Sequence, residues 1–411
     1  MITDQTGEAI APLKVLIIGG GIGGLCLAQG LRESGVAVAV YERDESANFR
    51  CQGYRIHINP FGYHALKACL PENAFHLYEA TSGEPPAGAH AEYDAQLNAT
   101  FSRPMRLNGG DSSVALSTEV NRLTLREILL HGLDDVVHFS KTLESYERLQ
   151  GGKVLARFAD KSTAEGNILI GADGTRSVVR QFLLPDAKLS ELGFAIYGKT
   201  PLTLSAIEWI PENLITGFSR VVDADGVAMI FGAYRKREPF VEAATKYVPA
   251  LRLTETEDYL MWTFRASFQQ LGLSEQEFWQ AAPPVLHAAA GNLVRAWHPS
   301  LRRIVFDAHV PSTFSVGFRA SEPVGAWQTT NVTLLGDAVH TMPPFRGVGA
   351  NTALRDAELL RTKLLGVARQ GTPLLEAIGE YEKEMIGYGF DAVRHSVERP
   401  LFGGPARVLP D

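Results

Sequence analysis

The sequence has little cysteine, and its cysteines are not spaced as pairs. Cys26, Cys51 and Cys69 are the three cysteines of the 411 residues, and no CxxC motif joins any two of them. An odd and scattered set argues against a disulfide framework or a thiolate metal site, and it indicates buried thiols in a reducing compartment. The 11 histidines form no HExxH pair and the chain has no GxSxG turn, so the sequence lacks the patterns of zinc and serine hydrolases.

Long apolar runs and an excess of basic charge are also missing. No stretch reaches the roughly 18 apolar residues of a membrane-spanning helix, and the polar first residues do not resemble a secretory signal. The 46 acidic and 39 basic side chains give a formal charge of −7, which disfavours nucleic acid or an anionic membrane as a partner. We therefore expect a cytoplasmic monomer or weak homodimer without an integral membrane segment, which acts on a small molecule.

The most informative segment that is present spans residues 15–42. Its order of strand, glycine-rich turn, helix and strand carries Gly19, Gly21 and Gly24 in GxGxxG spacing. Such glycines allow a tight turn, close approach of the backbone to a pyrophosphate, and close packing of helix on strand. Glu42 ends the second strand, where a carboxylate can accept hydrogen bonds from ribose hydroxyls. The unit predicts a site for the adenosine diphosphate half of a dinucleotide at a helix N-terminus, without separating NAD from FAD.

Two later segments repeat the order of strand, tight turn and helix. Residues 168–183, ILIGADGTRSVVRQFL, place Asp173 at the turn, and residues 331–366 place Asp337 after a buried strand and before PPFRGVGAN and a further helix. Three such junctions, far apart in the sequence, indicate one long ligand that distant parts of the chain contact together. FAD suits this arrangement better than NAD.

Residues 186–268 have a different character. Apolar and polar positions alternate, and DADG provides a hairpin turn, so we expect a separate and largely antiparallel sheet. The apolar and aromatic content of this segment suggests a hydrophobic, aromatic or polyketide-like substrate. The aromatic residues that we expect to include walls of the substrate pocket, although sheet packing would explain them equally well, are Tyr197, Phe231, Trp262 and Phe264.

Taken together, GGGIGG with Glu42, GADGTRS with Arg180, and GDAVHTMPPFRGVGAN resemble the class A flavoprotein monooxygenases, the family of p-hydroxybenzoate and salicylate hydroxylases and tetracycline-inactivating monooxygenases. The resemblance implies an α/β fold, in which a Rossmann-like FAD-binding domain of the p-hydroxybenzoate hydroxylase type carries an inserted antiparallel-sheet substrate domain and C-terminal helices. The implied domains are the first part of the FAD-binding domain at 12–185, with an irregular or β-structured insertion at about 75–118, the substrate domain at 186–315, and the second part of the FAD-binding domain with the C-terminal helix at 316–411.

The same resemblance assigns roles to individual residues. Glu42, with Arg43 beside it, matches the ribose-binding acid, and Arg50 and Arg122 match two arginines that contact the flavin. Asp337 matches the acid that holds the ribityl chain and phosphates. The complete cofactor-binding set implied in this way is Gly19, Gly21, Ile22, Gly23, Gly24, Glu42, Arg43, Arg50, Arg122, Asp173, Gly336, Asp337, Pro344, Gly347, Val348, Gly349, Ala350 and Asn351.

The chemistry implied by the resemblance needs noncovalent FAD, NAD(P)H as a transient co-substrate, and O2. A flavin C4a-hydroperoxide then transfers one oxygen atom to the substrate, as hydroxylation or epoxidation. Independently of the family, residues 347–351 open a helix whose N–H groups could stabilise the negative charge of a reduced flavin. His57 matches a position beside the isoalloxazine and is the candidate catalytic residue, against the alternative of a hydrogen-bonded core histidine; His340 is expected to fix its loop.

Other functions remain open from the sequence. FAD-linked reductases that saturate isoprenoid or related double bonds share this architecture and do not use O2. A flavin-binding protein without catalysis would bind FAD but show no turnover of a reductant. An NAD-dependent dehydrogenase would leave the segment GDAVHTMPPFRGVGAN unexplained. Oxygen uptake stimulated by a substrate would separate the monooxygenase from the others.

Overall fold

The computed structural model describes residues 12–47, 54–84, 88–104 and 117–398. Arg50 and Cys51 lie outside these ranges. Cys26 and Cys69 are buried free thiols, as the sequence indicates. In the part of the chain that is described, no helix is both long enough and apolar enough to cross a bilayer.

One half of the molecule is built on a parallel sheet. Its described strands follow the order β17-β11-β1-β2-β7, and all neighbouring pairs are parallel. Both faces are covered, which explains why β1 and β11 are almost continuous apolar runs rather than alternating ones. The strands are β1 (Lys14–Ile18), β2 (Ala37–Tyr41), β7 (Val137–His138), β11 (Ile168–Gly171) and β17 (Val332–Leu334).

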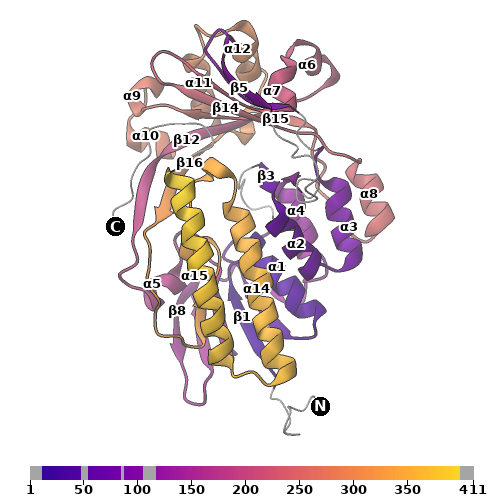
Figure 1. Cartoon of the computed structure of the whole chain (residues 1–411), viewed down its shortest axis with the longest axis vertical. Helices are drawn as coiled ribbons and strands as arrows, with labels where there is room; N and C mark the ends of the chain where they lie inside the picture. Colours follow the sequence, from indigo (N-terminus) through magenta and orange to yellow (C-terminus); the bar gives the residue numbers. More distant parts are fainter. Residues whose placement is uncertain (1–11, 48–53, 85–87, 105–116, 399–411) are drawn as a thin grey trace.

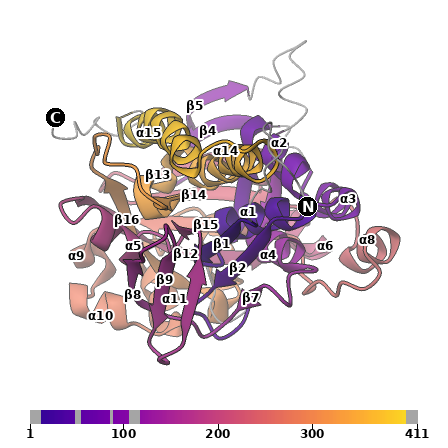
Figure 2. The ribbon, with the colours of Figure 1, turned by 90° about the horizontal axis from the view of Figure 1, so that it is seen from below.

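Helices and two small sheets complete this half. The long helices α14 and α15 run side by side along the lower half of the molecule, with α1 and α2 beside them (Figures 1 and 2). The helices are α1 (Ile22–Glu33), α2 (Pro60–Cys69), α3 (Glu72–Thr81), α4 (Arg122–Leu130), α5 (Val178–Leu183), α13 (Asp337–His340), α14 (Gly349–Gln370) and α15 (Leu374–Glu398). The small sheets pair β3 (Arg55–Ile58) with β6 (Thr118–Asn121), and β8 (Leu143–Arg148), β9 (Val154–Phe158) and β10 (Thr163–Gly166) with one another.

The other half is a larger sheet with helices on its outer face. The described strands follow the order β16-β12-β15-β14-β13-β4-β5, antiparallel except for the pair β13 and β4. Helices α11 and α12 cover the face that points away from the parallel sheet (Figure 1). The strands are β4 (Ala89–Tyr93), β5 (Ala99–Pro104), β12 (Leu189–Pro201), β13 (Phe218–Val222), β14 (Ala228–Tyr234), β15 (Tyr259–Arg265) and β16 (Phe314–Ser321). The helices are α6 (Leu204–Trp209), α7 (Glu212–Thr216), α8 (Phe240–Tyr247), α9 (Phe268–Leu271), α10 (Glu275–Gln280), α11 (Pro283–Leu293) and α12 (Pro299–Phe306).

The structure confirms the expected α/β class with its Rossmann-like parallel sheet, second sheet and C-terminal helices. Strands β4 and β5 fall in the segment expected to be an irregular or β-structured insertion, and they join the large sheet. The expected boundary between residues 315 and 316 falls inside β16. Ser274 and Glu277 form a capping box at the start of α10. Helix α10 ends at Gln280 and α11 begins at Pro283, because a proline cannot continue a preceding helix.

Candidate functional site

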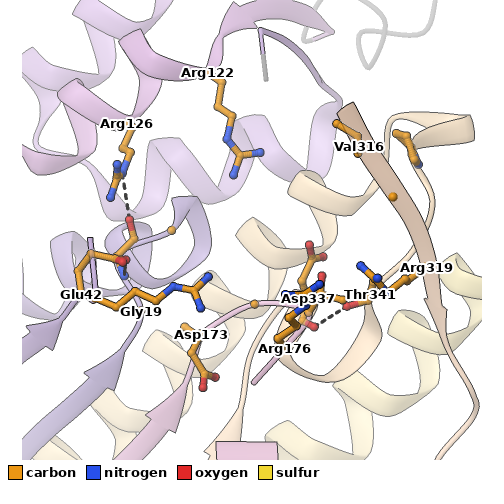
Figure 3. Close-up of a pocket in the computed structure, with 18 of the residues that line it drawn as sticks. Gly19, Glu42, Arg122, Arg126, Asp173, Arg176, Val316, Arg319, Asp337 and Thr341 are labelled. Carbon is orange, nitrogen blue, oxygen red and sulfur yellow. Dashed lines mark hydrogen bonds between the residues drawn. The ribbon is translucent and has the colours of Figure 1, made fainter. Parts of the chain in front are cut away.

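A pocket of about 680 Å³ lies between the two sheets. Its floor is formed by the carboxyl ends of β1, β2 and β11 and by the turn after β17, which is where open α/β sheets bind ligands. Its other walls come from β3, α4, β12, β15 and β16. The volume is in the range of small-molecule and cofactor sites, about 300–1,000 Å³. Figure 3 shows Arg122 and Arg126 on one side of this pocket and Asp173 and Asp337 on another.

The glycine turn between β1 and α1 has the geometry of a phosphate cradle. Gly19 has φ +111°, and a Cβ there would lie 2.3 Å from the carbonyl oxygen of Ala172. A Cβ on Gly21 would meet no protein atom within 4 Å, because this residue faces the pocket. The backbone can thus approach a ligand at the positive end of α1, and the turn fits a pyrophosphate group.

The next residues of the motif pack the helix rather than line the pocket. A Cβ on Gly24 would lie 2.4 Å from the carbonyl oxygen of Gly19, and one on Gly23 would lie 2.6 Å from Leu335. Ile22 is buried in the core. These three residues, expected in the cofactor-binding set, act on the ligand only through the position of α1.

Glu42 is held by the turn that it faces. Its Oε2 accepts a hydrogen bond from the Gly20 N–H at 2.6 Å, and its Oε1 accepts one from the Asp44 N–H at 2.9 Å. A carboxylate has about four acceptor positions, so Glu42, which lines the pocket, retains capacity for ribose hydroxyls. Arg43 lies at the exposed rim of the same pocket.

Asp173 presents an incompletely bonded carboxylate to the pocket. Its Oδ2 accepts hydrogen bonds from the N–H groups of Val178 at 2.7 Å and Val179 at 3.3 Å, while its Oδ1 is buried without a partner among the described residues. Burial raises the pKa of this carboxyl group. A buried oxygen of this kind is normally satisfied, so its position on the pocket wall fits a ligand with hydroxyl or N–H donors. Arg180 connects this turn to the turn after β17, because its guanidinium group donates hydrogen bonds to the carbonyl oxygens of Thr175 and Ala338.

Asp337 begins α13 with its side chain open to the pocket and surrounded by protein. Desolvation raises the pKa of its carboxyl group, and the positive charges of His340 and Arg122 oppose that change. Behind it, His340 Nε2 lies 2.7 Å from Asp356 Oδ2, and both side chains are fully buried. Asp356 also accepts hydrogen bonds from the Gly336 N–H and the Tyr388 hydroxyl. His340 therefore fixes this turn.

Basic side chains outnumber acidic ones in the lining of the pocket. Among the described lining residues, seven are arginine or lysine and three are aspartate or glutamate, in a chain of formal charge −7. Arg126 donates from Nε to the Gly20 carbonyl oxygen at 3.2 Å and from Nη1 to that of Ala47. The sequence reading missed Arg126, although its spacing of four from Arg122 on one helix indicates a shared face. Such a lining suits the phosphates of dinucleotides.

The segment from Gly347 to Asn351 lies beside the pocket rather than on its wall. Of the expected residues in this region, Pro344 lines the pocket, whereas Gly347, Val348, Gly349, Ala350 and Asn351 do not. Gly347 has a left-handed φ of +65°. Asn351 accepts a hydrogen bond from the Asn59 N–H at 2.8 Å and donates to the carbonyl oxygens of His57 at 2.7 Å and Gly347 at 3.0 Å. It thereby joins the start of α14 to β3, in which Arg55 and Ile56 line the pocket.

His57, the candidate catalytic residue, is outside the lining of the pocket. Its Nδ1 lies 3.1 Å from Glu119 Oε1, while its neighbours Arg55 and Ile56 line the wall. Alternation along β3 puts His57 on the same face as Arg55, and both side chains contact Oε1 of Glu119. His57 therefore has a hydrogen-bonding partner within the chain, and its catalytic role stays a prediction.

The aromatic residues that we expected in the substrate pocket lie on both faces of the large sheet, and one of these faces lines the pocket. Tyr197 lines the pocket together with Met261 and Phe314, and burial raises the pKa of Tyr197 to about 12. Phe231, Trp262 and Phe264 do not line it, and this expectation is corrected: they are buried in the core under α11 and α12. Alternation along β15 turns Met261 toward the pocket and its neighbour Trp262 to the opposite face.

Comparisons with known proteins were made on the sequence and on the structure. The model of a family described as "FAD binding domain" matches residues 113–394, and that of an NAD(P)-binding Rossmann-like domain matches residues 17–81. A crystal structure assigned as an FAD-containing monooxygenase from Photorhabdus luminescens subsp. laumondii has a TM-score of 0.78 and 31% identity, over 93% of this chain and 96% of that one.

Relatives found by sequence are also described as FAD-dependent monooxygenases. The dual O-methyltransferase/FAD-dependent monooxygenase elcB of Phaeosphaeria nodorum is 34% identical over 84% of this chain and 39% of its own length. The FAD-dependent monooxygenase phnB of Penicillium herquei is 27% identical over 93% of this chain and 89% of its own. The chain spans less than half the length of the first of these relatives.

Proposed function

This chain belongs to the FAD-binding domain family of FAD-dependent monooxygenases, and from that premise we propose that it uses NAD(P)H and O2 to insert one oxygen atom into a hydrophobic aromatic or polyketide-like compound, by hydroxylation or epoxidation. The observation that carries the proposal is a single pocket in which a phosphate cradle and an aromatic wall face each other. FAD supplies the redox and oxygen chemistry when it is bound.

The residues of the chain bind and orient the reactants. The turn at Gly19 and Gly21 with Glu42 would hold the adenosine diphosphate half of FAD, and Asp173 and Asp337, which line the same pocket, would accept hydrogen bonds from its hydroxyl groups. The basic lining offsets the charge of the phosphates. The large sheet forms the opposite wall of the pocket, through residues of β12, β15 and β16.

The substrate class has support from two directions. Tyr197, Met261 and Phe314 give the pocket an apolar and aromatic wall. The relative from Phaeosphaeria nodorum combines an O-methyltransferase with the monooxygenase by name. Because O-methylation requires a hydroxyl group, this combination supports a hydroxylated aromatic compound as the substrate or product here.

Oxygen consumption and product analysis test the proposal. Oxidation of NAD(P)H by the FAD-loaded protein should be slow alone and accelerate on addition of a substrate, with oxygen uptake and incorporation of one atom from ¹⁸O2 into the product. The alternative, an FAD-linked reductase of isoprenoid or related double bonds, predicts reduction of the substrate without air and an unoxygenated product. That second outcome would replace the monooxygenase.

The mode of flavin attachment is tested separately. We expect noncovalent FAD, since no histidine or cysteine is among the described residues that line the pocket. Denaturation should release the flavin into the supernatant, where its absorbance is measured. A precipitate that stays yellow would indicate covalent attachment. The state of a monomer or weak homodimer and the cytoplasmic location stay predictions.

A further inference from the structure

Arg55, on β3, is a buried cation on the wall of the pocket. Its side chain is 10% exposed, and its Nη2 lies 2.5 Å from Oε1 of Glu119, which is 4% exposed. A Cβ on Gly232 of β14 would lie 2.5 Å from Arg55 Nη1, so the glycine leaves room for the guanidinium group between the two sheets. The guanidinium carbon also lies 5.7 Å from the ring centroid of Phe218.

The hydrogen bonding of this arginine is incomplete. Its Nε is buried and has no partner in the described part of the chain. An unsatisfied buried donor is costly, and the cost is greater on a charged group. Because Arg55 lines the pocket, an acceptor on a bound molecule can complete its hydrogen bonds.

The other residues that line the same pocket indicate what that molecule looks like. The rings of Tyr197 and Phe314 are stacked with centroids 5.5 Å apart, and Tyr54 meets Phe314 edge-on at 5.3 Å. The acidic residues among the described lining, Glu42, Asp173 and Asp337, belong to the turns of the parallel sheet and not to this aromatic wall. A flat molecule that carries negative charge fits these features.

We propose that Arg55 is a specificity-determining residue, which binds an ionised oxygen of the aromatic substrate, a phenolate or an enolate. Oε1 of Glu119 pairs with the guanidinium group and also contacts His57. This inference rests on the proposed function for the nature of the ligand. It makes the charge of the substrate, and not only its shape, a criterion for binding.

The test uses calorimetric binding of two probes to the FAD-loaded protein. The first probe is 2,4-dihydroxyacetophenone, whose 4-hydroxyl ionises readily because it is para to the acyl group, and the second is its 4-methyl ether, which cannot ionise there. The wild-type protein should prefer the phenol, by a factor that grows as the pH passes through the ionisation of that hydroxyl. The titratable groups around Arg55 include Glu119, which pairs with it, His57, which contacts the same carboxylate, and Tyr259, whose hydroxyl group interacts electrostatically with Arg55; their effects are common to both probes.

Substitution of Arg55 should remove this preference. Arg55→Gln should weaken binding of the phenol at least tenfold and leave binding of the ether unchanged. The matched control is Arg235→Gln, because Arg235 pairs with Glu84 on the surface and does not line the pocket. This control should keep the wild-type preference.

Two further variants separate binding from folding. Arg55→Gln leaves Glu119 buried without its cation, so the double variant Arg55→Gln/Glu119→Gln removes both charges together and should show the same loss of preference. Glu119→Gln alone retains the cation and should retain the preference.

Three results would overturn the inference: equal binding of both probes to the wild type, no binding of either, or an unchanged preference in the folded variants that lack Arg55. The measurement needs no O2. A clear preference for the phenolate without incorporation of oxygen into any substrate would therefore reject the proposed function and leave the anion site in place.

Discussion

Asp337 and His340 lie three residues apart and have different surroundings. Asp337 opens into the pocket, whereas His340 is fully buried against Asp356. The first side chain has acceptor capacity for a ligand. The Nε2 atom of His340 is hydrogen-bonded to Asp356 on α14, and this contact fixes the turn that carries Asp337.

Replacement of Asp337 should therefore act on cofactor affinity. Asp337→Ala removes acceptors for ligand hydroxyls, and the loss of about 1–3 kcal/mol corresponds to roughly a tenfold to hundredfold rise in the Kd of FAD. Titration of the apoprotein by flavin fluorescence measures it. Asp225→Ala, in the exposed turn between β13 and β14, is the control and should leave the Kd unchanged. Equal Kd values in the two variants would remove Asp337 from the cofactor site.

The pair of His340 and Asp356 should act on stability instead. Asp356→Asn breaks a buried ion pair and should lower the free energy of unfolding by about 3–5 kcal/mol. Burial lowers the pKa of His340, but the charge of Asp356 and its hydrogen bond outweigh that effect, so the folded-state pKa lies above the ordinary value. The stabilisation is then complete below the unfolded pKa of about 6.5 and decreases as the pH rises through the raised value.

Urea unfolding of the wild type and His340→Gln at several pH values measures this dependence. The difference in unfolding free energy between the two proteins should be largest below about pH 6 and smaller in alkaline solution. A difference that grows with pH would contradict a raised pKa of His340.

At the scale of the element, the turn between β1 and α1 combines two requirements. Gly24 must lack a Cβ because the backbone of Gly19 lies against it. Gly21 must lack a Cβ because the space beside it, which contains no protein atom within 4 Å, is where we expect the ligand. The two requirements predict different effects for the same kind of substitution.

Gly21→Ala should fold normally and lose affinity for FAD, since the added methyl group meets no protein atom within 4 Å and enters the pocket. Gly24→Ala should lower thermal stability, since its methyl group would lie 2.4 Å from the carbonyl oxygen of Gly19. Thermal unfolding of both apoproteins, followed by titration with FAD, distinguishes the two. A loss of stability in Gly21→Ala with FAD affinity retained would contradict the assignment of this turn as the phosphate cradle.

At the scale of the whole molecule, the pocket connects two separate hydrophobic cores. One core surrounds the parallel sheet, and the other lies between the large sheet and α11 and α12. A ligand that fills the pocket contacts elements of both halves. Its binding energy adds to the stability of the folded chain by mass action.

FAD should consequently raise the melting temperature of the apoprotein in a concentration-dependent manner, by an amount equivalent to about 2.7 kcal/mol at a hundredfold excess over Kd. Scanning calorimetry measures the shift. ADP-ribose, which can occupy the glycine turn but lacks the flavin, is the control and should stabilise less at the same concentration. Equal shifts for both ligands would mean that the flavin half makes no contact with the protein.

Residues whose role depends on local backbone geometry could be identified from the sequence. Gly19, Gly21, Glu42, Asp173 and Asp337 were identified from the sequence, and all five line the pocket. Each belongs to a strand-turn-helix junction, where residue type is dictated by local backbone geometry and spacing. The parallel sheet was predictable for the same reason, because its buried strands are short apolar runs that end in such turns.

The aromatic wall could not be predicted in this way. Alternation assigned Met261 and Trp262 to opposite faces of one strand, but it does not tell which face meets the pocket. Phe231, Trp262 and Phe264 lie in the core, which is the alternative of sheet packing that the sequence left open.

The sequence by itself determined the dinucleotide cradle, the order of the elements and the family, because these depend on residues close together in the chain. Only the tertiary structure decided which side chains face the ligand. Arg55 and Arg126 come from separate elements, and the glycine that makes room for Arg55 is on a distant strand of the other sheet. Their meeting depends on how the two sheets pack, and no local pattern encodes that.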